Sequence, residues 1–383
     1  MNAGVYIHVP FCRSKCDYCS FLSVPVEPIV DGSSGGLFGR YVERLMAEIG
    51  SRAHETSDKA IDTIYFGGGT PSLLEPALVD RVIEAVRSAF RPAPAGLEIT
   101  MECNPEDFHP DWINGIRGAG VNRVVLGVQS LDGNLRSVMG RRGRIPDTVM
   151  LEAFFAAGDI VHCVDLIVGI PGQTREGLAL ELGRILAYRP EHLSAYILSV
   201  DRGTPLARRL VPTPEMELEQ RRRFEELIAA MEGAGYAHYE VSNFSLPGFE
   251  SRHNMKYWTF APYFGYGPGA HSFNGRERFF NPGTVQEYLD GPWKGPIPDE
   301  RGANAPADEF LLTGLRLRRG ITASAYLAAT GSRMPASLAE EFERLAEMGL
   351  AVVERDGADM RYRFTLEGMF YMDGLVARLA ARL

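Results

Sequence analysis

Six short runs rich in Val, Ile and Leu recur along the N-terminal half of the chain. Each run is apolar almost throughout rather than at every second position, which is typical of strands covered on both faces of a parallel sheet. Amphipathic patterns of helical period separate the runs, and several of them end at Gly or before Pro. The predicted strands are Val5 to Val9, Ile61 to Phe66, Leu97 to Glu102, Arg123 to Val128, His162 to Val168 and His192 to Leu198.

Strand and helix patterns that alternate in this way predict an α/β fold in which a parallel sheet curls into a barrel. A complete eight-stranded barrel takes about 250 residues, whereas this pattern ends near residue 210. We therefore expect a partial (β/α)6 TIM-like barrel over residues 1–210. Its functional residues should lie at the carboxyl ends of the strands.

The remainder of the 383-residue chain predicts two further segments. Residues 211–303 begin with a charged amphipathic helix and continue as an aromatic loop segment, which we expect to pack on the barrel. Residues 304–383 show helical patterns, then two strands around Asp356-Gly357, then a last helix. This order resembles a C-terminal winged-helix-like domain.

The charge balance argues against a nucleic-acid-binding protein, because 40 Lys and Arg face 49 Asp and Glu and the formal net charge is −9. No apolar run approaches the roughly 18 residues that a membrane span needs, and the N-terminus lacks the features of a signal peptide. We therefore expect a cytoplasmic protein that does not span a membrane. We also expect a monomer or a homodimer.

Three of the five cysteines, Cys12, Cys16 and Cys19, follow the first predicted strand with C-x3-C-x2-C spacing. Three thiolates in one loop can bind three irons of a 4Fe-4S cluster and leave the fourth iron open to a small molecule. A structural zinc site would need a fourth ligand, which His8 could supply only by folding back toward the loop. The cluster is therefore the favoured interpretation. The other two cysteines lie within or beside strands and are expected to be small buried hydrophobes.

The segment from Tyr6 to Phe21, Tyr-Ile-His-Val-Pro-Phe-Cys-x3-Cys-x-Tyr-Cys-x-Phe, resembles the radical S-adenosylmethionine (SAM) signature of the oxygen-independent coproporphyrinogen III oxidase group. In that family the three cysteines hold a 4Fe-4S cluster and SAM binds its fourth iron. Gly67-Gly-Gly-Thr-Pro-Ser72 resembles the family's glycine motif, whose backbone approaches SAM. Further matches are Glu102-Cys-Asn-Pro105, Gly127-Val-Gln-Ser130, Gly140-Arg141, Asp165-Leu-Ile-Val-Gly-Ile-Pro-Gly-Gln-Thr174 and Ser194-Ala-Tyr196.

The resemblance implies a SAM pocket at the carboxyl ends of the strands. Carboxylates such as Glu102 and Asp165 can accept hydrogen bonds from an ammonium group or ribose hydroxyls, and Arg141 can pair with the SAM carboxylate. The alternative for each carboxylate is that it caps a neighbouring helix. The implied SAM-binding residues are Tyr6, Gly68, Gly69, Thr70, Glu102, Gln129, Arg141 and Asp165.

Two branches of the family share this pocket. The decarboxylating oxidases typically carry a further cysteine two positions after the third, where this chain has Phe21, and an extension before the first strand that is not seen here. The chain therefore resembles the heme chaperone branch, whose members bind heme and pass it to respiratory proteins. This implies a protein that delivers heme to an acceptor, with peripheral contact at the inner membrane if the acceptor lies there. A radical SAM enzyme acting on a porphyrinogen is the alternative, and whether the chain is an enzyme stays open.

An HNxxYW motif further marks that branch and is present here as His253-Asn254-Met-Lys-Tyr257-Trp258. A neutral imidazole is a common axial ligand of heme iron, and aromatic side chains can cover a porphyrin face. His253 is therefore the first candidate heme ligand, with Tyr257 and Trp258 beside it. The alternative is that His253 and Asn254 hydrogen-bond the loop while the aromatic side chains pack it onto the barrel.

His271, in Gly265-Tyr-Gly-Pro-Gly-Ala-His-Ser272, is the second candidate heme ligand. Its neighbouring glycines suggest close approach of the backbone to another group, although a buried core histidine would fit as well. His238 and His8 have weaker support.

Overall fold

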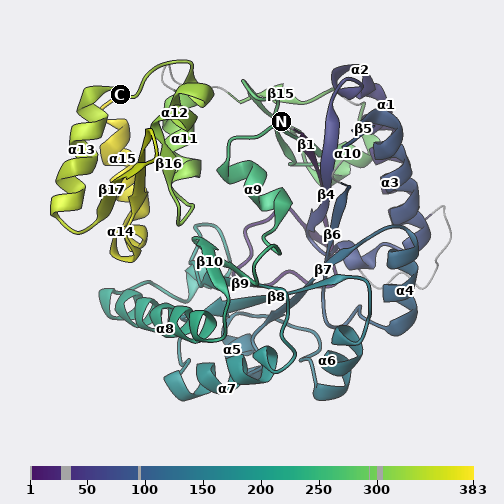
Figure 1. The fold of residues 1–383 in the computed structure, drawn as a ribbon. Coiled ribbons are helices and arrows are strands. Elements are labelled where there is room, and N and C mark those ends of the chain that lie inside the picture. Colours follow the sequence, from purple (N-terminus) through teal and green to yellow (C-terminus); the bar gives the residue numbers. More distant parts are fainter. Residues whose placement is uncertain (1, 27–35, 94–95, 293, 300–304) are drawn as a thin grey trace.

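The computed structural model describes residues 2–26, 36–93, 96–292, 294–299 and 305–383 (Figure 1). All six predicted strands are present and lie side by side, in the order β9-β8-β7-β6-β4-β1, with every neighbouring pair parallel. The predicted α/β fold is therefore confirmed. The strands are β1 (Ala3–Val9), β4 (Ala60–Gly68), β6 (Glu98–Cys103), β7 (Arg123–Gln129), β8 (Val161–Val168) and β9 (His192–Ile197).

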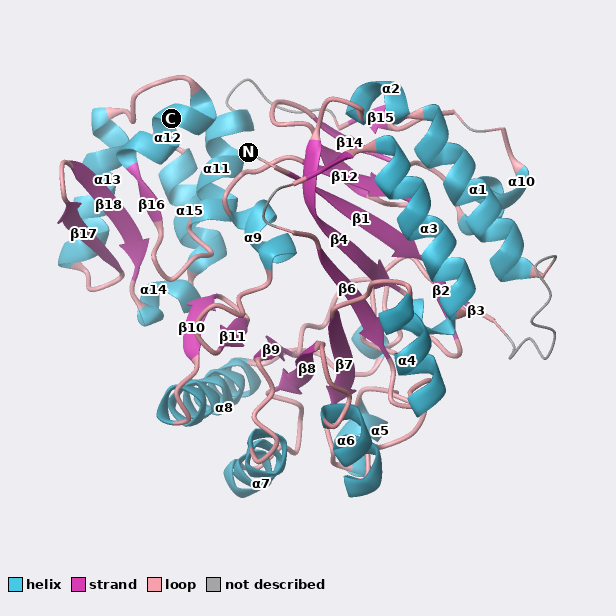
Figure 2. Cartoon of the chain, turned by 45° about the vertical axis from the view of Figure 1, so that its right-hand side comes forward, coloured by secondary structure: helices cyan, strands magenta, loops and turns pink. Residues whose placement is uncertain are grey.

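Helices cover the outer face of this sheet (Figure 2). The longer helices present apolar residues to the strands, as in the third helix, where Val79, Val82 and Val86 are fully buried. Side-chain caps begin several of them, for example Thr174 and Thr213. The helices are α1 (Leu37–Ser51), α2 (Ala53–Thr56), α3 (Pro76–Ala89), α4 (Pro110–Gly118), α5 (Gly133–Val138), α6 (Thr148–Phe155), α7 (Arg175–Leu186) and α8 (Pro214–Gly233), with short 3-10 turns η1 (Pro71–Leu73) and η2 (Leu206–Arg208).

The sheet continues beyond the parallel strands at both ends. Strand β11 pairs antiparallel with β9 and then with β10, while β12 pairs parallel with β1 and leads into an antiparallel extension. Within the described residues β10 and β15 end the order, so the barrel is open. The additional strands are β10 (Ala237–Glu240), β11 (Asn243–Ser245), β12 (Tyr263–Tyr266), β13 (His271–Phe273), β14 (Arg278–Phe280), β15 (Ile297–Pro298) and β5 (Arg91–Pro92), which pairs with β4, beside the separate pair β2 (Phe11–Cys12) and β3 (Val24–Pro25).

The segment expected to be an aromatic loop thus contributes short strands to both ends of the sheet, together with α9 (Arg252–Trp258) and α10 (Val285–Asp290). Strands of two to four residues leave no periodicity in the sequence, and they form here because the open edges of the sheet supply partners for their backbone. The proposed segment boundary at 210/211 stays a prediction, and the one at 303/304 lies outside the described residues.

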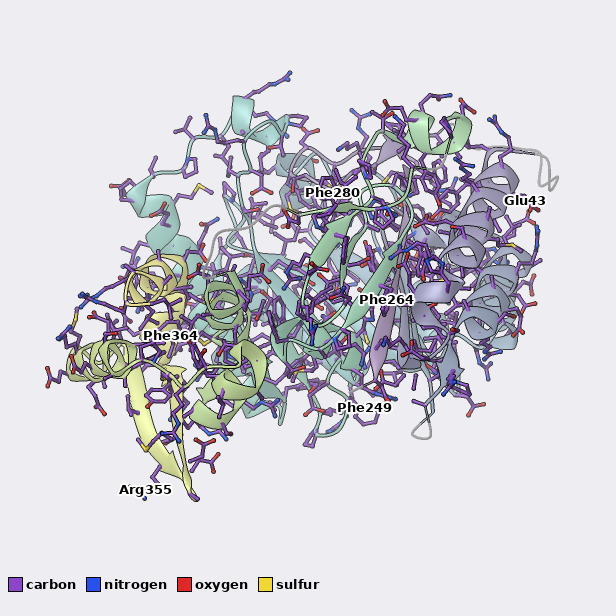
Figure 3. The ribbon with its side chains drawn as sticks, turned by 90° about the horizontal axis from the view of Figure 1, so that it is seen from above. Glu43, Phe249, Phe264, Phe280, Arg355 and Phe364 are labelled. Atoms are coloured by element: carbon purple, nitrogen blue, oxygen red, sulfur yellow. The ribbon has the colours of Figure 1, made fainter. Side chains whose placement is uncertain are left out.

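The C-terminal residues form helices and a three-stranded antiparallel sheet of order β16-β18-β17. The β17–β18 hairpin turns at Gly357, which has a φ of 61°. A separate hydrophobic core contains Phe342 and Phe364 and also takes in Phe260 and Phe273 of the aromatic segment. Figure 3 shows Phe364 in this C-terminal unit and Phe264 in the main sheet. The elements are α11 (Ala305–Gly314), β16 (Ile321–Thr322), α12 (Ala323–Thr330), α13 (Ala336–Glu347), β17 (Ala351–Asp356), β18 (Asp359–Phe364), α14 (Leu366–Phe370) and α15 (Met372–Ala380).

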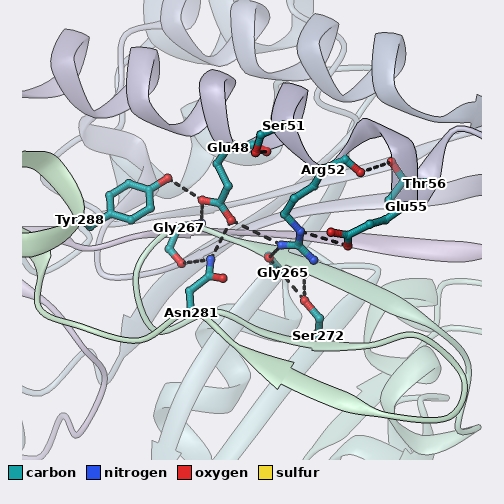
Figure 4. A network of polar contacts seen from close by, with 10 residues as sticks. All are labelled: Glu48, Ser51, Arg52, Glu55, Thr56, Gly265, Gly267, Ser272, Asn281 and Tyr288. Carbon is teal, nitrogen blue, oxygen red and sulfur yellow. Dashed lines mark hydrogen bonds and ion pairs between the residues drawn. The ribbon is translucent and has the colours of Figure 1, made fainter. Parts of the chain in front are cut away.

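A buried polar network joins the aromatic segment to α1 (Figure 4). The Glu48 carboxylate accepts hydrogen bonds from the Gly267 backbone N–H at 3.0 Å, Asn281 Nδ2 at 2.8 Å and Tyr288 Oη at 2.6 Å. Arg52, one helical turn further on, donates to the Gly265 carbonyl at 2.9 Å. The loop after β12 is therefore held against α1 by charged groups that are themselves buried.

Candidate cluster and cofactor site

A cavity of about 370 Å³ opens at the carboxyl ends of the parallel strands. It is lined by residues that follow or end β1, β4, β6, β7, β8 and β9, which is where parallel barrels place their functional groups. Of the predicted site residues it brings together Cys12, Cys16, Cys19, Gly68, Gly69, Thr70, Glu102, Gln129, Arg141 and Asp165.

The cysteine loop is fixed to the body of the protein at several points. Within it the Asp17 N–H donates to the Met139 carbonyl at 3.1 Å, and the Asp17 carbonyl accepts from the Leu206 N–H at 2.8 Å. A Cβ on Gly140 would lie 2.3 Å from the Asp17 carboxyl group, so only glycine permits this approach. The loop is therefore positioned by contacts with distant parts of the chain.

The three cysteines fit a 4Fe-4S cluster better than a single metal ion. In the part of the chain that the structure describes, no three His, Cys, Asp or Glu side chains are grouped to hold one ion. Thiolates that each bind a different iron of a cluster do not have to surround one point. The fourth ligand considered for zinc, His8, has its ring nitrogens at 3.1 Å from Tyr6 Oη and 2.7 Å from the Leu22 carbonyl, and it is absent from the lining of this cavity.

Arg141 lies between the cysteines and the strand ends. Its Nη1 is 3.4 Å from Cys16 Sγ, and its Nη2 donates to Asn104 Oδ1 at 2.6 Å and to the Gly127 carbonyl at 3.2 Å. Its Nε is buried and has no hydrogen-bond partner among the described residues. A guanidinium here can offset the negative charge of thiolates and offers a remaining donor to a carboxylate in the cavity.

Glu102 and Asp165 are buried carboxyl groups that line the cavity. Burial, together with the charge of Asp165, raises the pKa of Glu102 to about 7, against a hydrogen bond from Tyr65 Oη at 2.9 Å. Burial likewise raises the pKa of Asp165 to about 6. Asp165 Oδ1 has no hydrogen-bond partner in the described chain. Because both residues lie within strands, and the side-chain caps of the described helices come from other residues, the capping alternative is not supported.

Two positions of the glycine motif must be glycine because other parts of the chain leave no room for a Cβ. Gly68 has a φ of 107°, and a Cβ there would lie 2.5 Å from the His8 ring. A Cβ on Gly69 would lie 2.5 Å from the Phe11 carbonyl and 2.7 Å from that of Val9. These glycines let β4 end directly against the backbone that leads to the cysteines, while both also line the cavity.

Gln129 is a second backbone exception, because it has a φ of 63° at an irregularity between β7 and β8. Its side chain lines the cavity.

Tyr6 does not line the cavity. The Tyr6 ring instead stacks on Tyr65 with 6.2 Å between centroids and lies behind Glu102, next to Gly67. Tyr6 therefore supports the wall of the cavity in this structure.

The predicted heme residues lie outside this cavity. His253 is 1% exposed, and its ring nitrogens are 2.9 Å from Thr63 Oγ1 and 2.9 Å from Tyr257 Oη. Burial lowers the pKa of His253 to about 3. These contacts favour the alternative in which the HNxxYW motif fastens its segment to β4. Trp258 lies under Arg316, whose guanidinium carbon is 5.0 Å from the indole ring.

His271 differs from His253 because it is exposed, and its ring stacks on Phe280 with 5.6 Å between centroids. It is neither the pinned core histidine considered above nor part of the cysteine cavity. Cys103, expected to be only a buried hydrophobe, is buried but also lines the cavity. Its place at the end of β6, beside Glu102, is the signal that could have indicated this.

An open α/β barrel with three cysteines in a cavity at its strand ends is typical of a radical SAM protein, and the Radical SAM superfamily model matches residues 6–180. The chain is 35% identical over 337 residues to the heme chaperone HemW of a Synechocystis species, covering 84% of this chain and 80% of that protein. It is 35% identical over 353 residues to the heme chaperone HemW of Mycobacterium tuberculosis, covering 88% and 87%. The chain belongs to the HemW family.

A solved structure of coproporphyrinogen III oxidase (HemN) from Escherichia coli is similar to this chain with a TM-score of 0.79. The alignment covers 100% of this chain and 91% of that chain at 21% sequence identity. This likeness shows the fold. Among the described residues, we find no helix with the length and apolar character that crossing a membrane requires.

Proposed function

We propose that this chain is a heme chaperone that binds heme, a 4Fe-4S cluster and SAM and delivers the heme to acceptor proteins. The observation that carries the proposal is the similarity to proteins named heme chaperone HemW, at 35% identity over 84% of the chain. The cavity at the strand ends supports it independently, because it gathers the three cysteines and the polar groups that a SAM molecule would need.

In this proposal Cys12, Cys16 and Cys19 hold the cluster, and Arg141 binds the carboxylate of SAM. Asp165, with an unpartnered buried oxygen, and Glu102 accept hydrogen bonds from the SAM ammonium group or ribose hydroxyls. When bound, the cluster and SAM supply one-electron chemistry, and the surrounding strand ends exclude water from it. Carriage of heme itself needs none of this chemistry, so the pocket can act through binding alone.

The delivery partner is a finer part of the same proposal. We propose a respiratory acceptor protein, reached from the cytoplasm by peripheral contact at the inner membrane, and a monomeric or homodimeric chaperone. A porphyrinogen oxidase is not advanced as a second function, since 21% identity to HemN shows the fold alone. Phe21 also stands where the oxidases typically carry a further cysteine.

The test is an anaerobic hemin titration of the cluster-reconstituted protein, followed as a difference spectrum in the Soret region. We expect saturable binding of one hemin per chain, release of that hemin to a heme-depleted respiratory protein, and SAM consumption that coproporphyrinogen III does not accelerate. A His253→Ala variant titrated alongside should bind hemin as the wild type does. Absence of saturable binding, or SAM turnover driven by the porphyrinogen, would overturn the proposed function.

A further inference from the structure

A second cavity, of about 890 Å³, lies on the other side of the carboxyl end of β9. Residues 196–199 line both this cavity and the cysteine cavity, so the two share a wall. We call it the β9–α15 cavity. It is also lined by Phe224, His238, Val241, Ser242, Arg316, Leu350, Leu366, Met369, Phe370, Tyr371, Met372, Asp373, Gly374 and Leu375.

The size and walls of the β9–α15 cavity suit a large and mainly apolar ligand. Its volume lies within the range of about 300–1,000 Å³ that small-molecule sites occupy. Phe224 of α8 and Phe370 of α14 meet edge to face with 6.3 Å between centroids, and Leu366 and Leu375 add aliphatic surface. The cavity lies between α8 and the α14–α15 corner, elements that are far apart in the sequence.

Among the described residues that line this cavity, His238 is the one imidazole; it is 8% exposed and also lines a neighbouring cavity of about 740 Å³ beside Arg318. Its Nε2 is 3.3 Å from the Val241 carbonyl, which can only accept a hydrogen bond, so Nε2 carries the proton and Nδ1 carries the lone pair. Nδ1 is buried and has no hydrogen-bond partner in the described chain. An imidazole that donates one N–H to a backbone carbonyl and leaves the other nitrogen free is arranged as a metal-ligating histidine is.

The charge state of His238 suits the same role. Burial, and then the charge of Arg318, lower the pKa of His238 to about 4, although the carbonyls of Val241 and Glu240 oppose the shift. The imidazole is therefore neutral at neutral pH, as an iron ligand must be. Its ring is held in place by stacking on Phe244, with 4.4 Å between centroids.

Arg316 supplies a cation at the same cavity, where its charge also acts on the buried carboxyl group of Glu240. Its guanidinium is held over Trp258 of the HNxxYW motif, and its Nε is buried with no hydrogen-bond partner among the residues that the structure describes. A guanidinium beside an apolar cavity is suited to a carboxylate on an otherwise apolar ligand. A nucleotide would call for several such cations, whereas a porphyrin with propionate side chains needs an iron ligand, aromatic walls and few charges.

We propose that the β9–α15 cavity binds the heme, with His238 as axial ligand of the iron and Arg316 pairing with a propionate. This inference rests on the proposed function and adds where in the structure the heme binds. The motif histidine His253 then acts only in packing, and Trp258 acts by positioning Arg316. Heme in this cavity lies against residues 196–199 and so beside the cluster and SAM cavity.

The first experiment fills the cavity without removing a polar group. Gly374 lines the cavity on α15, and a Cβ there has no atom within 4 Å, so Gly374→Trp adds an indole to open space. Gly183 of α7 is also helical and exposed, with no atom within 4 Å of a Cβ, so Gly183→Trp is the matched control. We expect Gly374→Trp to weaken hemin binding about tenfold or more, while the control equals the wild type.

The second experiment distinguishes ligation of the heme iron by His238 from binding of the porphyrin ring in the cavity. His238→Ala should shift the hemin Soret maximum and weaken hemin binding, yet bind iron-free protoporphyrin IX as the wild type does. Arg316→Gln should weaken binding of hemin by about tenfold but leave binding of hemin dimethyl ester unchanged. Circular dichroism of each variant checks that it folds.

The outcomes separate the site from the function. If the wild type binds no hemin saturably, the proposed function and this site both fail. If the wild type binds hemin and Gly374→Trp binds it equally well with an unchanged spectrum, heme chaperone function stands and the β9–α15 cavity is refuted. If Gly374→Trp loses hemin but His238→Ala keeps the wild-type spectrum, the cavity stands and the ligand assignment is refuted.

Discussion

Replacement of Glu48 by Ala should destabilise the protein strongly, although Glu48 lies outside both cavities. The side chain is on α1, is 2% exposed, and holds the loop after β12 in place through Gly267, Asn281 and Tyr288 (Figure 4). It also faces the buried guanidinium of Arg52 at 3.5 Å. Its removal therefore leaves several buried donors without their acceptor.

The magnitude follows from those contacts. Each buried donor left unpaired costs about 1–3 kcal/mol, and breaking a buried ion pair by removing one partner costs about 3–5 kcal/mol. The two costs should not be added in full, because Arg52 retains two partners when Glu48 is removed. These are the Gly265 carbonyl at 2.9 Å and the Glu55 carboxylate at 3.4 Å. We expect a loss of about 3–5 kcal/mol. At about 2.1 cal/mol/K of unfolding entropy per residue, a chain of 383 residues should melt about 4–6 °C lower.

The assay is thermal unfolding by circular dichroism, with Glu43→Ala as control. Glu43 lies on the same helix, is labelled in Figure 3, and has a 61% exposed side chain paired with Arg81. Its removal should change stability by no more than about 0.5 kcal/mol. If Glu48→Ala melts within a degree or so of Glu43→Ala, the reasoning about the buried network is refuted.

The effect of Glu48→Ala should also depend on pH. Burial raises the pKa of Glu48 above its ordinary value of 4.5. The folded protein therefore keeps a proton on Glu48 that the unfolded chain loses as pH rises past about 4.5, so this contribution to stability is present at lower pH and declines above it. The difference between wild type and Glu48→Ala should be larger at about pH 5 than at about pH 8.

Three further results are expected at the cysteine cavity. Cys16→Ser should abolish the brown absorbance of the reconstituted cluster, and a full 4Fe-4S spectrum would contradict the ligand assignment. Arg141→Ala should weaken SAM binding in equilibrium dialysis by about tenfold or more, since a charge-assisted hydrogen bond is lost; unchanged affinity removes Arg141 from the site. The pKa of Glu102 is about 7 and that of Asp165 is about 6, so SAM affinity should rise with pH as both carboxylates ionise. Glu102→Gln should flatten the upper part of that rise. A SAM affinity of the wild type that does not change with pH would refute the assignment of these carboxylates.

The parallel strands could be predicted from the sequence because both of their faces are buried. A strand such as Val161–Val168 shows this burial as a run that is apolar except at His162 and Asp165, and positions at strand ends then indicate where the cysteines and carboxylates lie. The short strands β10 to β15 could not be predicted in this way. Their pairing depends on which sheet edges remain open, and that is decided by the parallel strands rather than by local sequence.

The heme assignment shows a different limit of sequence reasoning. The HNxxYW motif makes His253 the first candidate because it combines an imidazole with aromatic residues, but residue types alone do not indicate where the ring nitrogens point. In the structure those nitrogens face Thr63 and Tyr257. The sequence around His238 gives weaker support for a heme ligand. The cavity that His238 lines is formed with α14 and α15, which follow more than a hundred residues later.

The wall between the two cavities ties them together mechanically. Residues 196–199 run directly into the segment that contacts the cysteine loop, where Ser20 Oγ donates to Asp201 Oδ2 at 2.8 Å and the Leu206 N–H donates to the Asp17 carbonyl at 2.8 Å. A group bound in either cavity would therefore contact residues 196–199, which also line the other cavity. Binding in one cavity can change affinity in the other only if this shared wall differs between their occupied states, and its hydrogen bonds to the cysteine loop are the contacts through which such a difference would pass.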